Sequence, residues 1–238
     1  MSLLRRRGAI AGARAAGGPV VSVAHAGTEW TTSSLTLDFP AATQEGDLII
    51  AAAIININRS VTTPTGWTLE ADTGSGSGST SSRVYLFSKV YSSGDGADLT
   101  FATTSSSYSF SLSRFTDAGS VGDTATEFGD TAPDMTVAAD GAMRVVCLGG
   151  TSDAVNYSMA AGYTLFAENT AGSHSFATAG KNYDAGSTGT AEFSRTGGSL
   201  ATRLAALIIE PFPGAVALED DSGVMLLEDD SGSIALED

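Results

Sequence analysis

The sequence contains one cysteine, two histidines and almost no lysine. The single cysteine, Cys147, excludes an intrachain disulfide and a zinc site built from several cysteines. It lies in an apolar run from Met143 to Gly150, where we expect a small buried hydrophobic residue. No segment has the roughly 18 consecutive apolar residues that a membrane-spanning helix needs, so no membrane partner is expected.

Catalytic motifs are also lacking. His25 and His174 are the two histidines, and neither lies near a nucleophile or acid motif in the sequence. The Gly-x-Ser-x-Gly elbow of hydrolases and the His-Glu-x-x-His motif of zinc proteases do not occur. The sequence therefore predicts a protein that is not an enzyme and that needs no cofactor.

Positive charge is scarce and unevenly placed, since 12 basic residues face 27 acidic ones, for a net charge of −15. No acidic residue precedes Glu29, and no basic residue follows Arg203, although nine acids occur from Glu210 onward. A body this acidic repels phosphate backbones, so nucleic acid is not expected as a partner.

Residues 1–19 form a separate segment with a basic beginning. Its four positive charges are Arg5, Arg6, Arg7 and Arg14. We expect an extended arm that docks these arginines on an acidic partner surface. An export signal, which also begins with basic residues, and a leader without function remain alternatives.

An internal duplication organises the middle of the chain. Several motifs recur in the same order at offsets of 92 to 96 residues, so we expect two related halves, about 46–118 and 141–211. The matched pairs are GDLIIAAA with GAMRVVCL, TGWTLEADT with AGYTLFAEN, SKVY with GKNY, Phe101 with Phe193, and YSFSLSRF with RLAALIIE.

Each half is predicted to contain about five short strands. The run DLIIAAAII is apolar throughout and suits a strand covered on both faces, whereas RVYLFSKVY and YSFSLSRF alternate and suit one buried face. Glycine, serine and threonine crowd the segments between them. We therefore expect an all-β fold for residues 20–213, an antiparallel two-sheet β-sandwich of jelly-roll type that the two halves complete together. Two separate small domains are the alternative.

These motifs resemble a family of bacteriophage virion proteins. The resemblance covers Gly46 to Pro211 and is carried by GDLIIAAA, TPTGWTL, the aromatic-rich strand and the Ser/Thr-rich strand pair that follow. The second half departs from the pattern, with Gly141-Ala142 for Gly-Asp and Tyr163 for Trp67. The family implies a structural β-sandwich encoded among head and tail genes, and it supplies no catalytic residue.

Residues 214–238 repeat the unit LEDDSG, which resembles short tails of phage tail and fibre proteins. Apolar segments alternate with Asp-Ser-Gly turns, which predicts a β-meander with two apolar faces. Three such strands are not stable alone in water, so we expect them to dock on a partner, with a trimer favoured. The docking residues are Leu218, Val224, Leu226, Leu227, Ile234 and Leu236. As an alternative, Asp220, Asp221, Asp229 and Asp230 are weak candidates for Ca²⁺ ligands; no metal site is otherwise expected.

Aromatic residues suggest a second function. Trp30, Trp67 and Tyr163 are candidates for stacking on a sugar, as in carbohydrate-binding modules. The simpler interpretation is that Trp67 and Tyr163 pack equivalent corners of the two halves. We therefore expect a non-enzymatic structural protein of the virion, exposed on the particle at the tail, fibre or neck or as capsid decoration, and joined to other virion proteins through its ends. The alternative is a secreted or surface carbohydrate-binding module or lectin, and a host surface glycan is a candidate partner in either case.

Overall fold

The structure is a computed structural model, and it describes residues 18–28, 34–74, 82–103, 108–150, 156–170, 174–196, 202–213, 217–219 and 225–227. Within these ranges all regular structure is β, and every strand pair is antiparallel. The predicted all-β, antiparallel class is therefore confirmed. The described part of the chain contains no helix that is long and apolar enough to cross a membrane.

The first large sheet is built from the N-terminal half of the chain. Its five strands lie in the order β1-β7-β3-β5-β4. They are β1 (Val21–Thr28), β7 (Tyr108–Thr116), β3 (Leu48–Asn56), β5 (Ser82–Val90) and β4 (Thr68–Asp72). Strand β3, which is apolar except for Asn56, lies at its centre, where both of its faces are covered.

The second large sheet comes from the C-terminal half. Its order is β13-β14-β11-β18-β8, with the apolar strand β11 at the centre. The strands are β13 (Thr164–Asn169), β14 (Ser175–Tyr183), β11 (Ala142–Gly150), β18 (Arg203–Pro211) and β8 (Ala118–Phe128).

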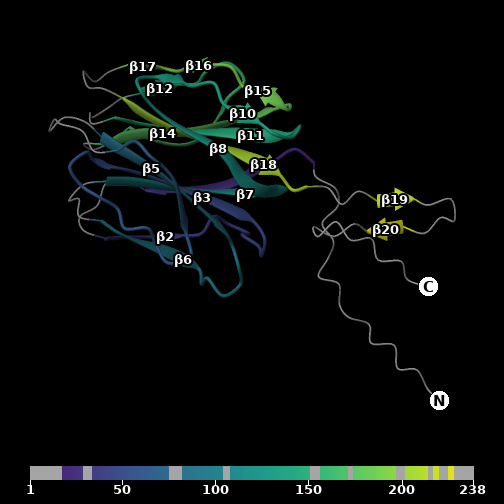
Figure 1. Cartoon of the computed structure of the whole chain (residues 1–238). Helices are drawn as coiled ribbons and strands as arrows, with labels where there is room; N and C mark the ends of the chain where they lie inside the picture. The colour runs from purple at the N-terminus through teal and green to yellow at the C-terminus, as the bar shows by residue number, and fades with distance from the viewer. Residues whose placement is uncertain are drawn as a thin grey trace.

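Two-stranded ladders lie outside the large sheets (Figure 1). Beside the first sheet, β2 (Ser34–Asp38) pairs with β6 (Asp98–Ala102). Beside the second sheet the pairs are β9 (Thr131–Ala132) with β16 (Ala191–Glu192), β10 (Thr136–Val137) with β15 (Gly186–Ser187), and β12 (Asn156–Ser158) with β17 (Ser194–Thr196).

The core has three layers of side chains. A central cluster joins the two large sheets, with Ile50 and Leu86 from the first packed against Val145 and Leu207 from the second. A second cluster lies between the first sheet and its ladder, and a third lies between the second sheet and its ladders. The sequence predicted one core between two sheets. The outer ladders add the other two, because they cover the apolar outer faces of β3, β5, β11 and β18.

Polar residues enter the central layer where they can hydrogen-bond across it. In β7 the three serines at alternate positions are buried, although the alternation predicted only one buried face. Ser109 Oγ donates to the carbonyl of His174 at 2.9 Å, and Ser82 Oγ donates to the carbonyl of Gly149 at 2.9 Å. These hydroxyls satisfy buried carbonyls of the opposite sheet, which offsets their loss of water.

The two large sheets have matching local geometry. Gly46 and Gly141 precede β3 and β11 with φ of 86° and 83°, and each donates its N–H over 2.9 Å, to Tyr91 and Tyr183 respectively. The register of β4 on β5 shifts between Leu69 and Ala71, and that of β13 on β14 shifts between Leu165 and Ala167. The turns before β4 and β13 also match: Trp67 N–H donates to Pro64 and Tyr163 N–H donates to Ala160, at 3.1 and 3.0 Å.

Part of the predicted C-terminal meander is described. β19 (Ala217–Glu219) and β20 (Met225–Leu227) form an antiparallel hairpin, which Figure 1 draws beside the body near the end of β18. Leu218 lies opposite Leu226 and Ala217 opposite Leu227. The expected third strand, with Ile234 and Leu236, lies outside the described residues.

Candidate functional site

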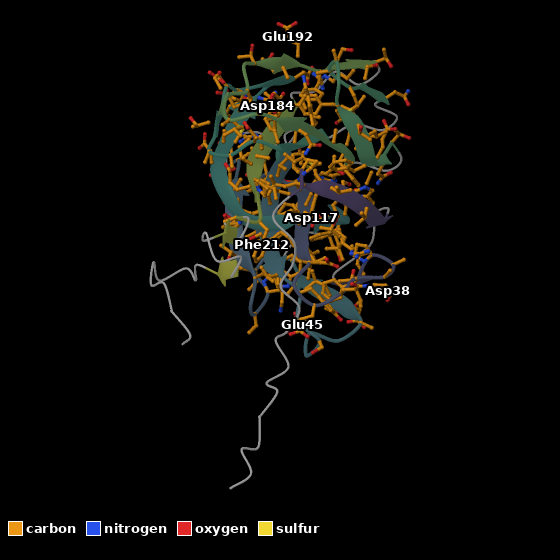
Figure 2. The ribbon with its side chains drawn as sticks, turned by 90° about the vertical axis from the view of Figure 1, so that its right-hand side faces the viewer. Asp38, Glu45, Asp117, Asp184, Glu192 and Phe212 are labelled. Atoms are coloured by element: carbon orange, nitrogen blue, oxygen red, sulfur yellow. The ribbon has the colours of Figure 1, made fainter. Side chains whose placement is uncertain are left out.

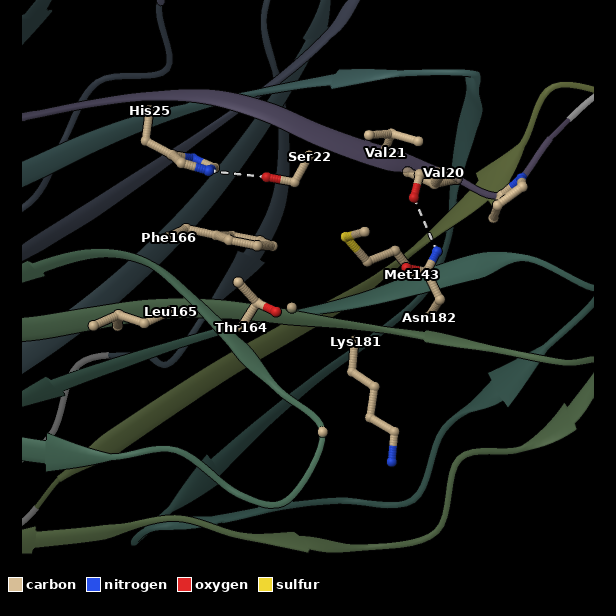
Figure 3. Close-up of a pocket in the computed structure, with 13 residues that line it drawn as sticks. Val20, Val21, Ser22, His25, Met143, Thr164, Leu165, Phe166, Lys181 and Asn182 are labelled. Atoms are coloured by element: carbon tan, nitrogen blue, oxygen red, sulfur yellow. Dashed lines mark hydrogen bonds between the residues drawn. The ribbon is translucent and has the colours of Figure 1, made fainter.

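A cavity of about 340 Å³ lies where the edge strands of the two large sheets approach each other. We call it the edge cavity. β1 supplies one wall, and β13 and β14 supply the other (Figure 3). Its lining includes Ser22, His25, Thr164, Phe166, Lys181 and Asn182. Asn182 donates from Nδ2 to the carbonyl of Val20 at 2.9 Å and so ties β14 to the start of β1.

His25 is held at one end of the edge cavity by two hydroxyls. Ser22 Oγ lies 2.9 Å from Nε2, and Ser113 Oγ lies 2.9 Å from Nδ1. The ring stacks on Phe166 with centroids 4.7 Å apart, and burial lowers the pKa of the imidazole. A neutral imidazole beside Ser22 could accept its proton. Catalytic triads use a carboxylate to stabilise the imidazolium that then forms, whereas here the orienting group is the hydroxyl of Ser113.

A second cavity, of about 250 Å³, lies over the outer side of the second sheet. We call it the tyrosine cavity. Its polar lining consists of Tyr163, Lys181, Tyr183, Thr188, Thr190 and Glu192. Lys181 lines both cavities. Thr190 and Glu192 are exposed at the rim, and Figure 2 shows Glu192 pointing outward at the end of the body.

Arg144 lies beneath the tyrosine cavity and is fully buried, at 0% exposure. Its guanidinium donates to the hydroxyls of Tyr163 and Tyr183 and lies 5.4 and 5.2 Å from the centroids of their rings. Three neutral acceptors surround Nη1, namely the carbonyls of Pro133 and Gly189 and the hydroxyl of Thr188, at 3.0, 2.8 and 2.7 Å. Burying a charge without an opposite charge is costly.

Within the described part of the chain, Arg144 makes no ion pair. One carboxylate joins its network indirectly, because Asp134 Oδ1 lies 3.5 Å from the Thr188 hydroxyl that Arg144 contacts. Asp134 is exposed, so water screens its charge. The positive charge of Arg144 is therefore only weakly compensated.

Lys181 adds a second positive charge next to Arg144. The two residues lie directly opposite each other in the β11–β14 ladder. Lys181 Nζ lies 5.0 Å from the centroid of the Tyr183 ring, and among the described residues it has no carboxylate within ion-pair distance. Like charges directly opposite in a ladder destabilise it, so this pair needs another source of stabilisation.

The predicted sugar-stacking residues are not brought together. Trp67 is 8% exposed and packs against Phe39 and Phe101 on the outer side of the first sheet. Tyr163 packs edge-on against Phe193 on the outer side of the second sheet. The two rings thus lie in different core clusters, and Trp30 lies outside the described residues.

The predicted docking ends are described only in part. Leu218, Leu226 and Leu227 belong to the β19–β20 hairpin. Four aspartates were weak calcium candidates, and within the described ranges no group of three or more metal-ligating side chains comes together. The residues that lie outside the described ranges are Arg5, Arg6, Arg7, Arg14, Val224, Ile234, Leu236, Asp220, Asp221, Asp229 and Asp230.

No family model, curated protein or solved structure matches the chain.

Of the residues that line the tyrosine cavity, only Tyr163 was selected from the sequence, as a sugar-stacking candidate, although the predicted duplication contains a signal for the site. Position 144 aligns with Ile49 at the offset of 95, so an arginine stands where the first half has a core residue. The contact between His25 and Ser113 joins residues that are 88 apart in the sequence, and no sequence motif predicted it.

Proposed function

We propose that the protein is a non-enzymatic structural protein of a bacteriophage particle, held in the particle through its ends. The observation that carries this proposal is the β19–β20 hairpin, which forms in the repeated acidic tail. An isolated two-stranded hairpin is marginally stable in water. A hairpin of mostly apolar residues in an acidic segment of the sequence is therefore best explained as an element that becomes stable when another chain covers it.

We further propose that the body is a duplicated jelly-roll sandwich. The order β1-β7-β3-β5, with β2-β6 on its outer face, suits a jelly roll, and β8-β18-β11-β14 repeats that order in the second half. The paired glycines Gly46 and Gly141 and the two shifts of register support the same conclusion. In this proposal each half is a small sandwich of its own, and the halves pack through their large sheets.

A compact body of this kind suits an exposed position on a particle. Figure 2 shows carboxylates spread along the side of the body, among them Asp38, Glu45 and Asp184. Such a surface favours solubility and disfavours contact with the packaged nucleic acid. Tail, fibre or neck association and capsid decoration all agree with this position.

The proposal is tested by incorporation into particles. The full chain and a chain ending at Pro213 are each produced during infection, and purified particles are analysed by quantitative mass spectrometry. We expect the full chain to copurify at a fixed number of copies and the shortened chain to be lost from particles. Equal incorporation of both chains would show that the tail is not the attachment element, and absence of both would refute the particle role.

A further inference from the structure

We propose that the tyrosine cavity binds a small sugar that carries a carboxylate, of the uronic acid class. Lys181 and one tyrosine hydroxyl hold the carboxylate, and the exposed rim contacts the sugar hydroxyls. The site would serve a particle protein and a free binding module alike, so it does not depend on the role proposed above.

The chain contains only two lysines, Lys89 and Lys181, and their surroundings differ. Each lies against the glycine of the equivalent turn: a Cβ placed on Gly66 would lie 3.1 Å from Lys89 Nζ, and one placed on Gly162 would lie 3.2 Å from Lys181 Cε. Lys89 forms an ion pair with Asp95 at 2.5 Å. The two lysines thus occupy the same place in their halves but have different partners.

The second half lacks the acid and adds a cation. At the offset of 92 that aligns the lysines, position 187 is a serine where position 95 is an aspartate. Lys89 lies opposite Ile49 in its ladder, whereas Lys181 lies opposite Arg144. One ladder therefore holds two neighbouring cations without a carboxylate partner among the described residues, in a chain with a net charge of −15. A bound anion would supply the missing charge.

The hydroxyls above Arg144 are arranged to donate. The Tyr163 and Tyr183 oxygens lie 3.1 Å apart, and both accept hydrogen bonds from the guanidinium. One phenolic hydrogen can bridge the two oxygens, which leaves the other hydrogen for a ligand. Together with the ammonium group of Lys181, this places two hydrogen-bond donors side by side, which suits the acceptor-only oxygens of a carboxylate.

The volume of the tyrosine cavity and the side chains at its rim limit what the ligand can carry besides its carboxylate. Sites for drug-sized ligands occupy roughly 300–1,000 Å³, so a cavity of about 250 Å³ suits a single small group. Glu192 and Thr190 at the rim offer acceptors to hydroxyl hydrogens, and the Glu192 carboxylate disfavours anions of higher charge. A monosaccharide with one carboxylate and several hydroxyls meets both requirements.

The two lysines provide a direct test. Labelling the full chain with ¹⁵N-lysine gives only two backbone amide signals, from Lys89 and Lys181, and the Lys89→Ala variant assigns them. Titration with D-glucuronate should move the Lys181 signal to saturation and leave the Lys89 signal in place. D-glucose, which lacks the carboxylate, should move neither signal at the same concentration. Movement of both signals together, or of neither with glucuronate, would overturn the proposal.

Variants at matched tyrosines test the assigned contacts. Tyr183→Phe keeps the ring and removes the hydroxyl, and we expect it to weaken glucuronate binding at least fivefold. Tyr91→Phe, the equivalent change in the first half, should leave the affinity unchanged within twofold. Equal losses in both variants would contradict the assignment. Binding of sulfate as tight as that of glucuronate would show a general anion site and would overturn the uronic acid class.

Discussion

The packing of the two large sheets predicts the effect of one methyl group at Gly149. This residue lies in β11, and the side chains of Ile54 and Val84 from the first sheet approach its Cα. A Cβ placed on Gly149 would lie 2.8 Å from Val84 Cγ2 and 2.9 Å from Ile54 Cγ2. Both neighbours are fully buried in the central cluster, so they have no solvent to move into.

The expected cost follows from these distances. Carbon atoms pack best at about 3.5–4.0 Å, so Gly149→Ala requires the sheets to separate or the side chains to leave their rotamers. Overpacking of this kind typically costs about 1–3 kcal/mol. Ile54→Ala removes both Ile54 atoms that clash, at a cost of about 2–5 kcal/mol when it stands alone. In the double variant the new methyl group occupies part of the space that the Ile54 side chain leaves. The loss of stability in the double variant should therefore be smaller than the sum of the two single losses.

The assay is urea unfolding followed by tryptophan fluorescence, with Gly94→Ala as the control. Gly94 lies in an exposed turn where the nearest atom to a new Cβ is 3.9 Å away, so its substitution should change the free energy of unfolding by less than about 0.5 kcal/mol. A Gly149→Ala variant as stable as the parent, or a double variant that loses the full sum of the single losses, would refute the close packing of the two sheets at Gly149.

Three further predictions concern buried polar groups. Burial lowers the pKa of His174 to about 4, below the usual 6.5, so the unfolded chain binds more protons between these values and stability falls as pH drops through them. The loss is up to about 3 kcal/mol, and His174→Gln should flatten that part of a urea-unfolding pH series; an unchanged slope would exclude His174 as its source. Burial raises the pKa of the Cys147 thiol, so an aromatic disulfide reagent should modify it only after unfolding, and fast modification of the native chain would contradict its position in the core. Asp47 pairs with Arg114 at 2.6 Å and has a side chain only 2% exposed, so Asp47→Asn should cost about 3 kcal/mol in thermal or urea unfolding, and a neutral effect would mean that the pair contributes little.

Much of the strand pattern could be predicted from the sequence. The apolar run at residues 47–55 became β3, and the alternating segments at 83–91 and 108–115 became β5 and β7. These segments are long and strongly apolar or periodic, and burial decides their structure. The edge strands β1 and β8 were not predicted, because exposed strands of small and polar residues such as those of β8 lack a periodic apolar signal.

The layers could not be predicted, because alternation reports burial without identifying what covers a face. In β5, Val84 and Leu86 face the other large sheet, and Tyr85 and Phe87 face the outer ladder. Both sets are buried, although we assigned one set to solvent. The serines of β7 were assigned to an exposed face for the same reason. A hydroxyl such as that of Ser109 can hydrogen-bond either to water at the surface or to a buried carbonyl.

The candidate site depended on contacts between distant residues. Arg144 and Lys181 lie in β11 and β14, whereas Tyr163 directly precedes β13 and Thr188 directly follows β15, and only the folded sheet brings them together. The predicted duplication nevertheless offered the necessary comparison, since aligning the two predicted halves places Arg144 at the position of Ile49.

The proposed assembly through the ends of the chain is tested most directly by the mass of the purified chain in solution. Sedimentation velocity compares the full chain with the chain ending at Pro213 across a range of concentrations. We predict that the full chain sediments as an oligomer, with the trimer favoured, and that the shortened chain sediments as a folded monomer. Two chains that both sediment as monomers, or that form the same oligomer, would contradict this account.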